Sequence, residues 1–159
     1  MVTEAMHTAF EEILRRDGHL VYKTRGVSME PMLHENRDLV ILQAPSLRLK
    51  KYDVALYKRE NAYVLHRVIG VEKERYLFRG DNTCTVEQVP FGAVIGVLTG
   101  FQRKGKQVAV TDGGYQHYVR LWCALYPVRT LYMRCRRLAA QAARRLGILP
   151  ALRKVQRHE

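Results

Sequence analysis

The hydrophobic positions follow a helical spacing at the start of the chain, a strand-like pattern in the middle and a helical spacing again at the end. Residues 3–16 carry apolar side chains three and four positions apart, Thr3 stands where an N-cap is expected, and Gly18 follows as a stop. These features predict a short amphipathic helix. Short apolar runs separated by turn residues then predict strands near 19–25, 38–43, 52–58, 62–70, 74–79, 93–100 and 106–110.

Many short strands at this spacing predict a mainly β fold, either an antiparallel sandwich or a partly open barrel. After the composition break at Asp112-Gly113-Gly114, residues 115–126 and 128–146 return to a helical pattern that Pro127 interrupts. In the second of these helices the apolar face is Val128, Leu131, Cys135, Leu138, Ala142 and Leu146, and the opposite side carries Arg129, Arg136, Arg137 and Arg144.

The chain is therefore expected to have three parts: an N-terminal amphipathic helix at 1–18, a β domain at 19–111 and a basic amphipathic helical tail at 112–159. A hydrophobic content of 47% is enough for a real core, which argues against a disordered chain.

The positive charge is concentrated in the tail. The net charge is +12, and residues 115–159 contain ten Arg or Lys against the single acid Glu159, whereas residues 1–114 contain 17 basic and 14 acidic side chains. Such a tail suits contact with an anionic membrane surface or a partner protein, or it packs its apolar face and leaves a solvated basic face. Nucleic acid is a less expected partner, because no base-reading motif accompanies the charge.

Cysteine usage and hydropathy limit the class of protein further. The cysteines Cys84, Cys123 and Cys135 are far apart, which predicts neither a disulfide framework nor a metal site, and no cofactor is expected. No apolar run reaches the roughly 18 residues of a membrane-spanning helix, and the first residues lack the pattern of a signal peptide. We expect a cytoplasmic protein, with peripheral attachment to a membrane as an option.

Three polar side chains stand out in the β region. Ser28 lies in a stretch built to display a side chain, between the flexible Gly26 and the stiff Pro31. His66 interrupts an otherwise apolar strand, and Asp81 lies on a tight turn after the next strand. A serine, a histidine and a carboxylate are the parts of a nucleophile, a general base and an orienting acid, although each residue taken alone is more often structural.

Four boxes of residues and a closing strand resemble a known family. The segment Gly26-Val-Ser28-Met29-Glu-Pro31-Met-Leu33, with Asp38 beyond it, resembles the Ser-Met-x-Pro box of type I signal peptidases and the related self-cleaving SOS-response repressors. Lys51-Tyr-Asp53-Val-Ala-Leu is similar to the strand that follows. Val64-Leu-His66-Arg67-Val68 resembles the branch of archaea, the endoplasmic reticulum and some spore-forming bacteria, in which histidine replaces the lysine base. Arg79-Gly80-Asp81-Asn82 and Ile95-Gly96-Val97 resemble that branch's Lys-Gly-Asp-Asn box and closing strand.

The resemblance implies a signal-peptidase-like β domain and a serine endopeptidase that acts on a peptide or protein precursor. It implies Ser28 as nucleophile and His66 as general base, and it leaves Asp81 and Glu87 as alternative orienting acids. Met29 and Pro31 would shape a pocket for small residues before the cut. Arg67, next to the histidine, is interpreted as an exposed strand arginine, with a contact to a carboxylate as the alternative.

The chain departs from the family in three respects. Arg37-Asp38 and Tyr52-Asp53 stand where the family has Gly-Asp, no transmembrane helix is found, and about twenty residues before the serine box are too few for a repressor's helix-turn-helix domain. The latter two departures put the usual substrates in doubt. A catalytically inactive peptide-binding module of the same fold is the main alternative, and a basic nucleic-acid-binding protein is a weaker one.

Overall fold

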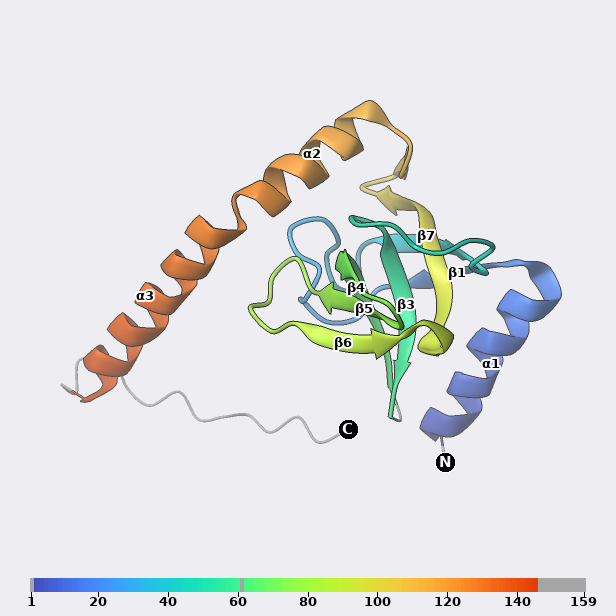
Figure 1. The fold of residues 1–159 in the computed structure, drawn as a ribbon, viewed down its shortest axis with the longest axis horizontal. Coiled ribbons are helices and arrows are strands. Elements are labelled where there is room, and N and C mark those ends of the chain that lie inside the picture. Colours follow the sequence, from blue (N-terminus) through green and yellow to red (C-terminus); the bar gives the residue numbers. More distant parts are fainter. Residues whose placement is uncertain (1, 61, 146–159) are drawn as a thin grey trace. The chain divides into compact units, whose positions relative to one another are not determined.

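Eight antiparallel strands make up most of the first part of the molecule. The computed structural model describes residues 2–60 and 62–145, which fall into two units, Met1–Arg120 and Leu121–Glu159 (Figure 1). The strands are β1 (His19–Lys23), β2 (Leu39–Gln43), β3 (Val54–Arg59), β4 (Ala62–Val71), β5 (Arg75–Arg79), β6 (Glu87–Pro90), β7 (Val94–Arg103) and β8 (Lys106–Ala109). One turn of 3₁₀ helix, η1 (Phe91–Ala93), precedes β7.

The strands form one open sheet in the order β1-β2-β7-β3-β4-β5-β6, with β8 paired to β7. This architecture confirms the predicted mainly β, antiparallel fold class. The short strand β6 was absent from the sequence prediction, because its four residues include Pro90 and show no clear alternation. It forms as the partner of β5, with Phe78 opposite Glu87.

One cluster of the hydrophobic core consists of apolar side chains from β3, β4, β5 and β6 and from the loop before β3. Its members are Leu49, Ala55, Tyr57, Val68, Tyr76, Phe78 and Val89. The Tyr57 ring lies 4.6 Å from the Phe78 ring, measured between centroids. Burying these rings fixes β3 against β5, and therefore also fixes the strand β4 that runs between them.

Helix α1 (Val2–Asp17) matches the helix predicted at 3–16 and packs on the sheet through a few apolar residues. The Phe10 ring contacts Tyr22 of β1 and Tyr63 of β4, with centroid distances of 5.3 and 5.6 Å. The Glu11 carboxylate accepts a hydrogen bond from the Tyr63 hydroxyl. Since Gly18 has a positive φ of 73°, it lets the chain turn directly from the helix into β1.

The predicted C-terminal helices are α2 (Gly113–Ala124) and α3 (Tyr126–Arg145), and the predicted residue Leu146 lies outside the described residues. The predicted interruption lies at Leu125, between the two helices, and Pro127 itself lies in the first turn of α3, where proline is tolerated. Tyr115 and Val119 are buried in the first unit, which therefore extends beyond the predicted boundary at residue 111. None of the helices in the described residues is both long enough and apolar enough to cross a membrane.

Candidate active site

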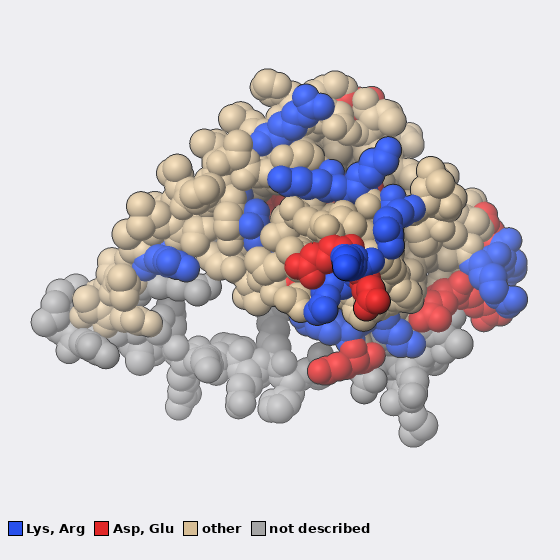
Figure 2. Space-filling model, viewed as in Figure 1, with Lys and Arg blue, Asp and Glu red and all other residues tan. Residues whose placement is uncertain are grey.

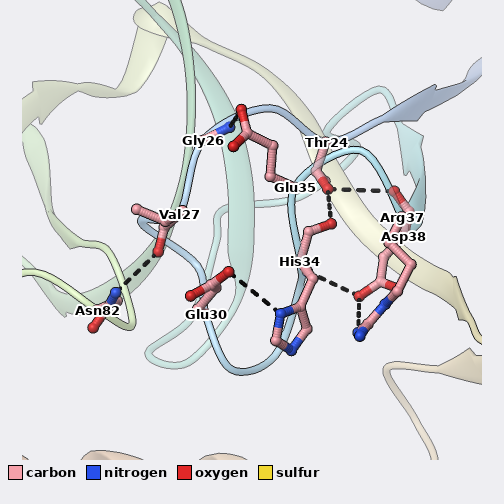
Figure 3. A network of polar contacts seen from close by, with 9 residues as sticks. All are labelled: Thr24, Gly26, Val27, Glu30, His34, Glu35, Arg37, Asp38 and Asn82. Carbon is pink, nitrogen blue, oxygen red and sulfur yellow. Dashed lines mark hydrogen bonds and ion pairs between the residues drawn. The ribbon is translucent and has the colours of Figure 1, made fainter. Parts of the chain in front are cut away.

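The loop between β1 and β2, which carries Ser28, is held by its own polar contacts (Figure 3). The Thr24 hydroxyl lies 3.1 Å from the His34 carbonyl oxygen, and the Asp38 carboxylate accepts the His34 N–H at 2.9 Å. The Gly26 N–H donates to the Glu35 carboxylate at 3.0 Å, in a left-handed conformation with φ of 80° that glycine adopts without strain. Hydrogen bonds thus join the two sides of this loop and fix its conformation.

Asp38 anchors the end of this loop and is fully buried. Burial alone would raise the pKa of its carboxyl group, but the Arg37 guanidinium at 2.7 Å and the His34 N–H reverse the effect, so the pKa is lowered. A charged carboxylate therefore holds the loop at neutral pH.

A second loop, the turn between β5 and β6, is hydrogen-bonded to the serine loop. The Asn82 N–H donates to the Ser28 carbonyl oxygen at 2.8 Å, and the Asn82 side-chain amide donates to the Val27 carbonyl oxygen at 3.2 Å. Gly80 makes this approach possible: a Cβ atom there would lie 2.7 Å from the Ser28 carbonyl oxygen and 3.0 Å from His66 Nε2. The position of this Cβ atom is thus within contact distance of both the Ser28 backbone and Nε2 of His66.

His66 lies on β4 and is only 6% exposed. Its Nδ1 atom is 3.1 Å from the Tyr57 hydroxyl and 3.4 Å from Glu87 Oε1. Glu87, at the start of β6, also pairs with Arg59 at 3.0 Å. A carboxylate and a hydroxyl next to Nδ1 favour the tautomer with its proton on Nδ1, which leaves Nε2 as an acceptor on the side of Ser28.

The electrostatics of His66 keep the imidazole neutral. Burial lowers its pKa from the ordinary value of about 6.5, and the Glu87 charge, which acts in the opposite direction, offsets only part of this change. Burial also raises the pKa of Tyr57, and the charge of Glu87 adds to that rise. At neutral pH the site therefore holds an uncharged histidine able to accept a proton and a tyrosine that keeps its own.

Asp81 has a different partner. Its carboxylate forms two hydrogen bonds with the Arg67 guanidinium, at 2.8 Å from Nε and 2.7 Å from Nη2. Arg67 also donates to the Tyr52 carbonyl oxygen, the Tyr115 hydroxyl and the Met32 sulfur. Although burial acts to lower the pKa of Arg67, the Asp81 charge more than reverses this effect, and the pKa is raised.

The interpretation of Arg67 as an exposed strand arginine is wrong, because its side chain is 1% exposed. Arg67 joins the serine loop through Met32, the β5–β6 turn through Asp81 and helix α2 through Tyr115. Its burial was not visible in the sequence, because two of these partners, Met32 and Tyr115, lie 35 and 48 positions away.

A cavity of about 870 Å³ opens beside these groups. Ser28, Met29, His66 and Glu87 line it, whereas Asp81 and Pro31 are not among its lining residues. Its far wall is aromatic and comes from Phe10, Tyr22 and Tyr63, a feature that sequence reasoning missed because the three rings belong to separate elements.

Two strand edges border the cavity, and no other strand of the described residues pairs with them there. Consecutive residues 22–26 line it on one side and consecutive residues 63–66 on the other. Successive side chains of a strand point to opposite faces, so a run of consecutive lining residues brings the main chain itself to the cavity. β1 pairs only with β2, and β4 pairs with β5 only from Arg67 onward. Because the main chain of Thr24 and the N–H of Gly26 are hydrogen-bonded within the serine loop, these edges offer an extended ligand only the main-chain groups that the sheet and this loop do not use.

Ser28 lines the same cavity as His66, but its hydroxyl is not hydrogen-bonded to the imidazole. Among the hydrogen bonds of the described residues, none joins Ser28 Oγ to the His66 ring, and none uses the Ser28 N–H. Catalytic hydrogen bonds are often long in an unliganded enzyme and shorten when substrate binds. The described residues contain no group of three or more His, Cys, Asp or Glu side chains able to hold a metal ion.

A comparison of the chain with models of known protein families finds no match, and a comparison with curated proteins finds none either. A functional assignment therefore depends on the geometry of the site and on the likeness of the four sequence boxes.

Proposed function

We propose that this protein is a serine endopeptidase that cleaves an extended segment of a peptide or protein precursor, with Ser28 as nucleophile and His66 as general base. The observation that carries the proposal is the joint presence of Ser28, a neutral buried His66 and Glu87 on one cavity. The four boxes that resemble the signal-peptidase class are independent support. The proposed site is one in which Glu87, rather than Asp81, orients the histidine.

The proposed reaction begins when the Ser28 hydroxyl attacks a peptide carbonyl carbon while its proton passes to His66 Nε2. The new imidazolium is stabilised by Glu87 at Nδ1, and the same proton is then given to the amine as the C–N bond breaks. Water, deprotonated by His66, releases the acyl group. The unused N–H of Ser28 is a suitable donor for the oxyanion, a contact that contributes roughly 3–4 kcal/mol in other enzymes.

The two strand edges at the cavity suggest how the substrate is held. A strand inserted between them would form hydrogen bonds with the main-chain groups on each edge that the sheet does not use, which is the β-addition mode of peptide binding. This mode requires an extended segment, so a folded part of a protein would not fit. The sequence resemblance adds small residues, such as alanine, before the cut.

A catalytically inactive peptide-binding module is the second candidate function, favoured by the missing hydrogen bond between Ser28 and His66. One experiment separates the two. The protein is incubated with a library of peptides rich in small residues and, separately, with a serine-directed phosphonate. The peptidase predicts cleavage that falls by at least about 10³-fold in Ser28→Ala and in His66→Ala, together with a covalent adduct that is lost in Ser28→Ala.

The chain offers matched controls, because Ser46 is its only other serine and lies in an exposed loop. Ser46→Ala and His117→Ala, the latter in an exposed position of α2, should keep full cleavage and full labelling. Peptide binding without cleavage or labelling in the wild type would establish the inactive module instead.

A further inference from the structure

The second unit presents an apolar helix face to solvent. In α3 the side chains of Val128, Leu131 and Leu138 are 65%, 63% and 65% exposed, and Tyr132 is 65% exposed. At 100° per residue these positions share one face of the helix. Four large apolar side chains in water on one stripe are unfavourable unless another surface covers them.

Arginines lie on both borders of this apolar face. Arg136 lies about 80° to one side of Val128, and Arg134 lies about 120° to the other side, both exposed. At the start of α3 the Arg129 guanidinium stacks 3.4 Å from the centre of the Trp122 ring. An apolar stripe bordered by long cations and accompanied by tryptophan and tyrosine is the arrangement of a helix that lies in a membrane interface.

The charge of this region has one sign. Residues 113–145 contain seven arginines and no acidic residue. On the face drawn in Figure 2, acidic and basic side chains lie close together over the first unit, whereas no acidic side chain lies along α3. The complementary surface must therefore be anionic as well as apolar.

We propose that α3 attaches the protein to an anionic lipid bilayer by inserting its apolar face at the level of the headgroups. An anionic bilayer supplies dense negative charge directly beside apolar chains. Nucleic acid would neutralise the arginines but leave the leucines in water, and a second copy of a wholly cationic helix would be repelled. The inference does not rest on the peptidase activity.

The test is co-sedimentation of the full chain with vesicles of phosphatidylcholine alone or mixed with phosphatidylglycerol. The wild type should bind the anionic vesicles and not the neutral ones, and added salt should weaken binding. Arg134→Gln/Arg136→Gln should bind about 30-fold more weakly, since each basic residue near the surface contributes about 1 kcal/mol, or fivefold. Leu131→Glu/Leu138→Glu should abolish binding.

Two matched controls keep the same chemical change but move it away from α3. Leu47→Glu replaces a leucine that is 81% exposed in a loop of the first unit, and Lys104→Gln/Lys106→Gln removes two exposed lysines. Both should bind as the wild type does, and circular dichroism should show that every variant keeps its helix content.

A single tryptophan gives a direct measure of insertion, because Trp122 is the only tryptophan in the chain. In Trp122→Phe/Leu131→Trp the one indole stands on the apolar face, and its emission should shift to the blue on anionic vesicles and be quenched by brominated acyl chains. Trp122→Phe/Lys104→Trp should show neither change.

Three results would overturn the proposal. The first is no binding to anionic vesicles, or equal binding to neutral ones. The second is binding that Leu131→Glu/Leu138→Glu retains, since the apolar face would then play no part. The third is that DNA or a second copy of the chain, measured by sedimentation velocity, occupies this surface under conditions in which vesicles do not.

Discussion

His66 and Arg67 are neighbours on β4, and they illustrate two ways of using a buried polar side chain. The strand points them to opposite faces. His66 faces a cavity, is neutral, and has contacts of 3.1 and 3.4 Å at one ring nitrogen while the other remains available. Arg67 is charged and surrounded by partners, two of them the oxygens of one carboxylate. The first arrangement suits proton transfer, and the second suits a structural contact that holds several elements together.

The two acids differ in the same way. The Glu87 side chain is 19% exposed, lines the cavity and shares its charge between His66 and Arg59. The Asp81 side chain is 3% exposed and pairs with Arg67. Glu87 is therefore positioned to affect the chemistry of the site, whereas Asp81 is positioned to maintain its shape. Five substitutions test this separation of roles, beginning with the largest expected effect.

Asp81→Asn should have the largest effect, which is a loss of stability. It leaves the Arg67 guanidinium buried without its countercharge, which costs about 3–5 kcal/mol in the free energy of unfolding. Chemical denaturation measures this quantity. Exposed Asp112→Asn is the matched control and should change stability by less than about 1 kcal/mol. A stable Asp81→Asn protein that lost only activity would reverse the roles assigned to the two acids.

Glu87→Gln should have its main effect on activity. The loss of the carboxylate leaves the imidazolium without its partner, and we expect kcat/KM to fall by about 10²-fold, at the low end for acid–base groups because the acid is partly exposed. The pH profile provides a second readout. His66 must be neutral to act as a base, and its pKa is lowered, so the midpoint of the acid limb of kcat/KM of the wild type should lie below about pH 6.5.

The direction of the change in pH profile follows from the sign of the Glu87 effect. The Glu87 charge raises the pKa of His66, so its removal lowers that pKa and moves the acid limb of kcat/KM to lower pH. Asp81 acts in the same direction but is the smallest contributor, and its removal should move the limb less. A limb that moves upward in Glu87→Gln would contradict the proposed contact.

Gly80→Ala should lower both stability and activity, each by a smaller amount than the two preceding substitutions. The added methyl group would lie 2.7 Å from the Ser28 carbonyl oxygen, and because this is backbone the turn and the serine loop must move apart. Overpacking of this kind costs about 1–3 kcal/mol. Gly92→Ala serves as the control, since its Cβ would meet nothing within 4 Å. The midpoint of thermal unfolding and kcat/KM should both fall in Gly80→Ala, and both should stay unchanged in Gly92→Ala.

The smallest expected effects come from two matched hydroxyl deletions. Tyr57→Phe removes the hydroxyl 3.1 Å from His66 Nδ1, and Tyr115→Phe removes the one 3.2 Å from Arg67 Nη1. A single hydrogen bond contributes about 0.5–1.5 kcal/mol. We expect Tyr57→Phe to lower kcat/KM about two- to tenfold, and Tyr115→Phe to lower stability while leaving the pH profile in place. Identical behaviour of the two variants would remove the distinction between the faces of β4.

The sequence predicted the secondary-structure elements better than the tertiary contacts between them. The apolar periodicity located α1 and most strands, and the serine box and the histidine strand marked two residues that line one cavity. It could not choose between Asp81 and Glu87, because both acids follow the same strand. The β5–β6 register makes the difference by placing Glu87 opposite Phe78, beside the core that holds Tyr57.

The shape of the cavity was equally inaccessible. An aromatic wall made of Phe10, Tyr22 and Tyr63 requires α1 to lie across two strands that are far apart in the chain. Each residue by itself fits a helix or strand pattern, and periodicity says nothing of which faces meet. Long-range packing therefore determines the part of the site that would contact substrate.

The contact between Arg67 and Tyr115 also sets an order in time. These residues are 48 positions apart, so the contact cannot form until most of the compact unit has been synthesised. A nascent chain that has released β4 but not α2 from the ribosome holds a guanidinium that still lacks one of its partners. The serine loop, the β5–β6 turn and α2 all assemble around the Arg67 side chain. The site therefore becomes rigid only late in the synthesis of the protein.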